Sequence, residues 1–499
     1  MSLDPSPLSP RPTPLLNPTD PAPGRGSALI GGGVAVVLAA IIAFVSLTEG
    51  THLLYLPQGL QAHANAVVNQ LPQIQGFSDY WTKSFDVNGF KGYTDANADT
   101  NQKIMNDEAT TYHMNLAVIT ITADMQKNTD TSVNFDPISS QNTYSDAVYS
   151  AMANQARANG MTPAFRLEVR ITNDQNHNYA STPVGQTWGN AFSVPNEQAW
   201  FNSYTNFAVH YALLAQKLNV PLLIIGSDLA YITTDANPSS KKLPGRQWGN
   251  PDDGCYGPRD CEWRHVIRAV HSSSYTPIGS KKATKGGGYV GALTFAATAK
   301  IDPTGNSALQ TGSQWTLITF WDALNVIGID AFVPLTNGGA DPTPSELESA
   351  WKGEYIPGAT PTNAVGNIFK KMRDMSDHYN RRILFTGAGY ESLTGATAAP
   401  GSYPGTQIDP AEQQNDMEGL LQTFSNEPWW LGVIWSYDYP VWPRNSLADT
   451  SSSTGYPGLA EANYDTNTEW AGKQAGKYLG QTYQNAPLPE TLWEALTQQ

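Results

Sequence analysis

The sequence predicts an α/β protein: a (β/α)8 TIM barrel preceded by a single transmembrane helix. Two observations predict the barrel. Short apolar segments alternate with longer helix-like segments, and eight of these strands fit within roughly 400 residues. A long charge-free apolar run ahead of the first strand predicts the membrane helix. A doubly wound open sheet is the alternative, but the glycine-rich phosphate turn expected after its first strand is absent.

The amino-terminal region predicts a membrane anchor. Residues 1–26 are rich in Pro, Ser and Asp, and we expect a disordered cytoplasmic tail. Residues 27–48 contain a charge-free apolar run of about 20 residues, enough to span a bilayer as a helix. Arg11 and Arg25 precede the run and Glu49 follows it, which places the amino terminus in the cytoplasm. A cleaved signal peptide is the alternative, but the long leading tail and the lack of an Ala-x-Ala site favour an uncleaved anchor.

Beyond the anchor, we expect a stalk over residues 49–75, a barrel over 76–485 and a carboxyl-terminal tail over 486–499. This topology puts the barrel outside the cytoplasm, in a periplasm or at the cell surface. The chain has 29 basic and 44 acidic residues, a net charge of −15. Phosphate binding needs clustered Lys and Arg, so this balance argues against nucleic acid as a partner.

The two cysteines, Cys255 and Cys261, flank a short loop that contains Gly and Pro. Such a loop closes readily as a disulfide, which fits an oxidising compartment beyond the membrane. A metal site is the alternative, but two thiols without a matching pair of histidines disfavour it.

Each strand of the barrel is predicted from a short apolar run. The eight expected strands are 76–81, 115–122, 163–171, 221–229, 289–297, 326–335, 383–390 and 431–437. The helix-like segments between them include 144–159, 197–218, 314–325 and 364–379. Strands that alternate with helices indicate parallel βαβ units.

The end of the seventh expected strand carries the motif Thr386-Gly387-Ala388-Gly389-Tyr390. Barrel enzymes place their chemistry at the carboxyl ends of strands. This motif resembles the seventh strand of glycoside hydrolase family 113, where the pattern Thr-Glu-x-Gly-Tyr supplies the nucleophilic Glu. Gly387 stands at the position of that Glu and has no carboxylate. The resemblance spans most of residues 76–483.

The fourth expected strand ends in Gly226-Ser227-Asp228, which resembles the Gly-Thr-Glu of the same family. The resemblance implies that Asp228 stands at the acid/base position. Asp is one methylene shorter than Glu, so its carboxylate would be withdrawn, and an error of 1 Å can cost a factor of about 100 in rate. Both departures from the family pattern imply lost hydrolytic activity.

Two other carboxylates are candidate substitutes, Glu168 near the end of the third strand and Glu391 after the seventh. Inverting glycosidases tolerate about 6.5–9.5 Å between their two carboxyl groups, so Asp228 paired with Glu168 or Glu391 is conceivable. The other interpretation of Glu168 is an ion pair with Arg166 or Arg170. An Asp inside a barrel strand, such as Asp330, is typical of a hydrogen-bonded structural residue.

Aromatic residues predict a sugar-binding surface. Trp435 ends the eighth strand, where related barrels stack a sugar ring, and Tyr390 and Trp81 are further candidates. Flat aromatic faces suit the apolar faces of pyranose rings. Packing in the core is the alternative for each of them.

Asp95, Asn97 and Asp99 alternate as the oxygen ligands of a calcium loop do. The loop lacks the central glycine and the closing Glu, so a polar loop ahead of a helix is the preferred interpretation and no cofactor is expected.

The leading hypothesis is therefore a membrane-anchored, extracytoplasmic pseudo-glycosidase that binds a glycan or serves as a structural subunit of a membrane complex. The alternative is an active, mannanase-like hydrolase of atypical mechanism that uses Asp228 with Glu168 or Glu391.

Overall fold

The computed structural model describes most of the expected barrel. Described are residues 74–79, 105–106, 108–138, 145–171, 194–234, 254–273, 288–299, 314–336, 341–354, 367–400, 409–436, 460–461, 471–472, 474–483, 488 and 490–497. The chain divides into two units, Met1–Ala66 and Val67–Gln499, and all described residues belong to the second. The expected membrane helix, Trp81 and the calcium-like loop lie outside the described residues. Within the described part, no helix is long and apolar enough to span a bilayer.

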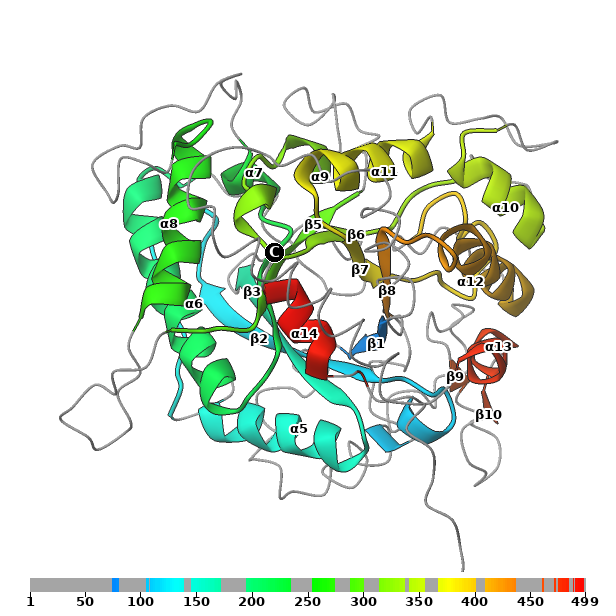
Figure 1. The fold of residues 1–499 in the computed structure, drawn as a ribbon, viewed down its shortest axis with the longest axis horizontal. Coiled ribbons are helices and arrows are strands. Elements are labelled where there is room, and N and C mark those ends of the chain that lie inside the picture. The colour runs from blue at the N-terminus through cyan, green and yellow to red at the C-terminus, as the bar shows by residue number, and fades with distance from the viewer. Residues whose placement is uncertain are drawn as a thin grey trace, which may run out of the picture. The chain divides into compact units, whose positions relative to one another are not determined.

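The strands form a closed parallel barrel in chain order, as the sequence predicts (Figure 1). They are β1 (Ile74–Asp79), β2 (Leu116–Met125), β3 (Thr162–Ile171), β4 (Leu222–Ser227), β5 (Ala292–Thr298), β6 (Ile327–Asp330), β7 (Ile383–Ala388) and β8 (Trp430–Trp435). The barrel closes through β1, which pairs with both β2 and β8. All the strand carboxyl ends therefore meet at one rim.

Helices surround the barrel, with α5 packed on β2 and β3 and α6 packed on β4 (Figure 1). The longer helices are α5 (Asp146–Ala158), α6 (Glu197–Lys217), α8 (Pro258–Ser272), α10 (Pro344–Trp351), α11 (Ile368–Tyr379), α12 (Pro410–Phe424), α13 (Gln474–Thr482) and α14 (Glu490–Thr497). The short ones are α7 (Ala230–Thr233), α9 (Gln314–Leu317) and the 3-10 turn η1 (Trp321–Ala323). A small antiparallel pair joins β9 (Ala460–Glu461) to β10 (Ala471–Gly472).

Two predicted elements differ from the structure. The expected helix over 314–325 is divided into α9 and η1. The buried side chains of Trp315 and Trp321 anchor these two pieces, and the Trp321 indole N–H donates to the Trp315 carbonyl at 3.0 Å. The sixth strand ends at Asp330 instead of continuing to Leu335, because the backbone turns there: the Val333 N–H donates to the Ala331 carbonyl and the Leu335 N–H to the Thr397 carbonyl, both at 3.0 Å.

The barrel separates two hydrophobic cores. The inner core contains Leu116, Ile224 and Leu384 from the strands, and Leu492 and Leu496 from α14. The outer core lies between the strands and the surrounding helices. Figure 1 shows α14, in red, drawn over the ring of strands. The segment predicted as a tail, 486–499, thus contains a helix that completes the barrel core, since its apolar side chains are removed from water there.

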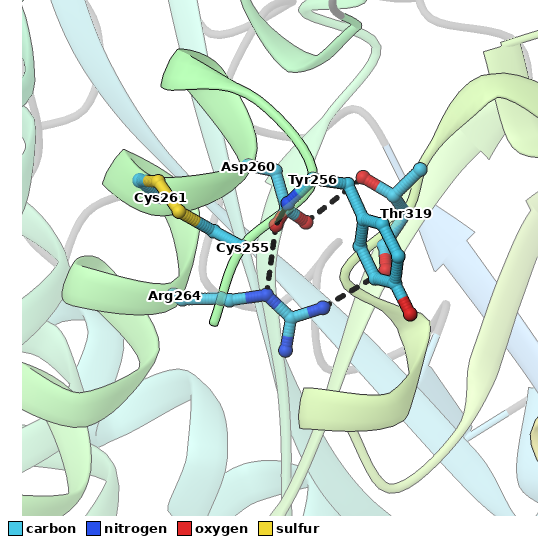
Figure 2. Close-up of a disulfide and its surroundings, with 6 residues drawn as sticks. All are labelled: Cys255, Tyr256, Asp260, Cys261, Arg264 and Thr319. Carbon is cyan, nitrogen blue, oxygen red and sulfur yellow. Dashed lines mark hydrogen bonds and ion pairs between the residues drawn. A yellow bond between two sulfur atoms is a disulfide. The ribbon is translucent and has the colours of Figure 1, made fainter. Parts of the chain in front are cut away.

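The predicted disulfide between Cys255 and Cys261 is confirmed; its Cα atoms are 5.1 Å apart. It closes the loop that leads into α8, and Figure 2 shows Asp260 next to it. Asp260 is buried and accepts hydrogen bonds from the backbone N–H of Tyr256 at 2.7 Å, from Arg264 Nε at 2.9 Å and from Thr319 Oγ1 at 2.9 Å. The bridge and the carboxylate together fix the start of α8.

Replacing both cysteines by serine is expected to lower the free energy of unfolding by about 2 kcal/mol, the chain-entropy value for so short a loop. Urea unfolding of the two proteins measures the difference. Added reductant should produce the same loss in the wild type and no further loss in the Ser variant. Equal stability of wild type and variant without reductant would contradict the prediction.

Candidate functional site at the carboxyl-terminal rim of the barrel

A buried polar cluster lies inside the barrel, where the middle of β3 faces the carboxyl ends of β6 and β7. Arg166 Nη2 donates to both carboxylate oxygens of Asp330, at 2.7 and 2.8 Å. Thr386 Oγ1 donates to Asp330 Oδ1 at 2.8 Å. All three residues are buried. The structure confirms that Asp330 is a hydrogen-bonded residue within its strand, and the bonds direct its lone pairs to Arg166 and Thr386.

Gly387 lies directly beside this cluster. A Cβ atom built at Gly387 would be 2.8 Å from Asp330 Oδ1 and 3.4 Å from Phe332 Cε2. Real Cβ atoms do not approach an oxygen this closely, so any side chain at 387 forces the Asp330 carboxylate to move. The register between β6 and β7 also shifts here, which brings Asp330 opposite Gly387. Glycine at this position therefore makes room for Asp330.

Asp228 lies just beyond β4 in a strained turn. Asp228 and Leu229 both have positive φ, 58° and 50°. A left-handed backbone conformation costs a non-glycine residue of order 1–3 kcal/mol of folding free energy. Such a residue keeps this conformation only where contacts with the surrounding structure fix it. The buried Gln314 supplies such a hold, because its amide nitrogen donates to the Asp228 carbonyl and, at 2.7 Å, to Thr233 Oγ1. Gln314 Oε1 also accepts from the Thr298 backbone N–H at 2.9 Å.

Glu168 belongs to the same end of the barrel. It lies on β3 opposite Thr122 of β2, two residues after Arg166, and is 7 % exposed. Side chains two residues apart on a strand point to the same face, so Glu168 points to the interior, as Arg166 does. Glu168, Asp228 and Gly387 thus each lie toward the carboxyl-terminal end of the barrel.

Three other predicted site residues lie elsewhere. Trp435 is fully buried in the outer core, and its indole N–H donates to the Tyr483 hydroxyl at 2.7 Å. Tyr390 also belongs to the outer core. Glu391 is completely buried, and its charge is close enough to Asp416 of α12 to raise the pKa of the Asp416 carboxyl group. Neither Trp435 nor Tyr390 lines the barrel interior, since alternation along β8 and the turn after β7 direct them to the helix layer.

A separate cleft of about 470 Å³ opens at the amino ends of the strands. Its lining includes Pro163, Pro221, Val290 and Trp493. It therefore lies at the opposite end of the barrel from the carboxylates described above. In the part of the chain that the structure describes, no three His, Cys, Asp or Glu side chains are grouped as a metal site would need.

The family model of Glycoside Hydrolase Family 113 matches residues 84–241 and 308–456, more than half of the chain. The chain belongs to glycoside hydrolase family 113. No curated protein sequence matches it. The fold is similar to that of the GH113 β-mannanase AaManA from Alicyclobacillus acidocaldarius, with a TM-score of 0.52 and 16% identity over 83% of this chain and 98% of the mannanase. It is also similar to the fold of a GH113 β-1,4-mannanase solved as a complex, with a TM-score of 0.51 and 17% identity over 83% of this chain and 100% of that mannanase.

As a GH113 chain, this protein places its polar cluster where barrel enzymes place their chemistry. Sequence reasoning did not identify Thr386 and Gln314 as parts of the site. A signal for the cluster exists in the sequence, since Arg166 stands between the apolar residues Phe165 and Leu167 of a strand and so faces the side opposite to theirs. A buried charge needs a partner, and Asp330 is the acid at the matching level of another strand.

Proposed function

We propose that this GH113 barrel binds a β-linked glycan without hydrolysing it, and that the anchor over 27–48 holds it on the outer side of a membrane. The observation that carries the proposal is the contact between Gly387 and Asp330. The resemblance assigns the nucleophile to position 387, and the nearest acid there has both oxygens bonded to Arg166. A retaining mechanism needs one carboxylate free to attack the anomeric carbon, and Asp330 does not offer one.

Three further features support the proposal. The polar end of the barrel is retained, with Arg166, Glu168 and the braced turn at Asp228 in place. Phe332 is half-buried and lies beside Gly387, where its aromatic ring is a candidate contact for a sugar. The disulfide fits an oxidising compartment, which supports an extracytoplasmic barrel.

The test uses the full chain, kept soluble with mild detergent, and β-1,4-mannooligosaccharides as the probe. We expect calorimetry to detect binding and a reducing-sugar assay to detect no product, with the wild type and Asp228→Asn giving the same result. Turnover that disappears in Asp228→Asn would overturn the proposal and favour the mannanase-like alternative with Glu168 or Glu391. Absence of both binding and turnover would also overturn it and favour a structural subunit.

Phe332→Ala is expected to weaken glycan binding about tenfold, the effect of losing roughly 1.4 kcal/mol from an aromatic contact. Phe369→Ala is the matched control, because Phe369 is also half-buried but packs on the outer core. Calorimetric titration of both variants measures the difference. Equal weakening in the two variants would show that stability, not contact with the sugar, is responsible.

A further inference from the structure

A second polar cluster fastens the segment after β7, residues 389–400, to α12. Glu412 Oε2 accepts from the Gly395 backbone N–H at 2.8 Å, and Glu412 Oε1 accepts from the Thr397 backbone N–H at 3.0 Å. The Thr397 carbonyl in turn accepts from the Leu335 backbone N–H at 3.0 Å, in the segment after β6. Thr397 therefore joins α12 to both segments that follow Asp330 and Gly387 in the chain.

The Thr397 hydroxyl lies between two carboxyl groups. Its oxygen is 2.9 Å from Glu412 Oε1 and 2.7 Å from Asp416 Oδ1. A hydroxyl has one hydrogen and can donate to only one of them. If both carboxyls were ionised, the other carboxylate oxygen would face the lone pairs of Thr397. One of the two carboxyl groups must therefore supply a proton of its own.

Asp416 is the carboxyl group that fits this role. Burial raises the pKa of Glu412 too, but the two backbone N–H bonds that it accepts besides the Thr397 hydroxyl oppose this rise and favour its ionised form. Asp416 is 0% exposed, and its Oδ2 has no hydrogen-bond partner among the residues that the structure describes. A separation of 2.7 Å is usual for a hydroxyl donating to an oxygen. Asp416 then donates to Thr397, and Thr397 donates to Glu412.

The surroundings of Asp416 are acidic. The titratable groups that face it are Glu412 on its own helix, Glu391 and Tyr390 after β7, and Asp341 ahead of α10. On the adjacent helix α13, the titratable side chain of Tyr478 lies within electrostatic reach of Glu418, another residue of α12. Burial first, and then the charges of Glu412, Glu391 and Asp341, raise the pKa of Asp416 well above its ordinary value, although the Thr397 bond opposes this. No Lys or Arg among the described residues pairs with Asp416.

We propose that Asp416 holds a proton in the folded protein, and that this proton fastens residues 389–400 to α12 and to the segment after β6. A carboxyl group whose pKa is raised on folding binds its proton more tightly in the folded state. The stability that it contributes is full below the unfolded pKa of about 4 and is lost as the pH rises through the folded pKa. The rim segments after β6 and β7 are thus held more firmly in acid. This holds whether or not the barrel binds a glycan.

The test compares the full wild-type chain with Asp416→Asn, whose amide can donate to Thr397 without titrating. The midpoint of thermal unfolding of the wild type should fall as the pH is raised from 5 to 9, and that of Asp416→Asn should fall less. Asp374→Asn on the exposed face of α11 removes the same charge and should follow the wild type. The same pH dependence in wild type and Asp416→Asn would overturn the proposal.

Infrared spectroscopy gives a readout that does not depend on stability. At neutral pH the wild type should show the carbonyl band of a protonated carboxylic acid, and Asp416→Asn should lack it. Thr397→Val keeps the shape of the side chain but removes its hydroxyl. In this variant the backbone amides of peptide 389–400 should exchange their hydrogens faster than in the wild type, once the rates are corrected for the intrinsic effect of pH on exchange. A wild type without the acid band, or a Thr397→Val variant with unchanged exchange, would contradict the proposal.

Discussion

Asp330→Ala is expected to lower the free energy of unfolding by about 3–5 kcal/mol, because it removes one partner of a buried ion pair. The side chains of Arg166 and Asp330 are only 5% and 8% exposed. The substitution takes from the Arg166 guanidinium the carboxylate that accepts its hydrogen bonds, and solvent cannot replace it. It also takes the acceptor from Thr386. Urea unfolding of wild type and variant measures the loss.

Two controls separate the ion pair from its surroundings. Asp374→Ala breaks an exposed pair with Lys370 on α11 and should cost less than about 1 kcal/mol. Thr386→Val removes only the hydroxyl that bonds Asp330 and should cost about 1 kcal/mol. A loss in Asp330→Ala no larger than in Asp374→Ala would contradict the role given to the buried pair.

Gly387→Glu, which introduces the carboxylate that the sequence resemblance assigns to this position, is expected to destabilise the protein by about 3 kcal/mol or more and, under the proposed function, to create no hydrolase. The new Cβ alone would sit 2.8 Å from Asp330 Oδ1, and overpacking of this kind costs about 1–3 kcal/mol. The new carboxylate adds the repulsion of a second buried negative charge next to Asp330. Urea unfolding and a reducing-sugar assay on β-1,4-mannan measure the two effects.

A series of variants at position 387 separates the steric from the electrostatic contribution. Gly387→Ala tests the Cβ alone, and Gly387→Gln has the size of Glu without its charge. Adding Asp330→Asn to Gly387→Glu should recover part of the stability, since one of the two facing charges is removed. If Gly387→Glu were as stable as the wild type, the close contact between Gly387 and Asp330 would not be what excludes a side chain there.

The order of the strands could be predicted from the sequence, because apolar runs of strand length separated by helical segments repeat along the whole barrel. The disulfide could be predicted as well, since Cys255 and Cys261 are close in the chain and no other cysteine competes. The motif around Gly387 was sufficient to indicate the glycosidase family. Each of these features is determined by residues that are close together in the sequence, so the local sequence pattern is enough to predict it.

Only the tertiary structure decided which of the candidate residues share the barrel interior. Trp435 and Ile434 are adjacent in sequence, yet Trp435 packs against Tyr483 in the outer core and Ile434 belongs to the inner one. Glu391 lies near Gly387 in the chain but is fully buried, within electrostatic reach of Asp416 on α12. The physical reason is that register shifts and strand alternation set which face a side chain occupies. A shift of one residue reverses that face, and composition and spacing do not reveal the shift.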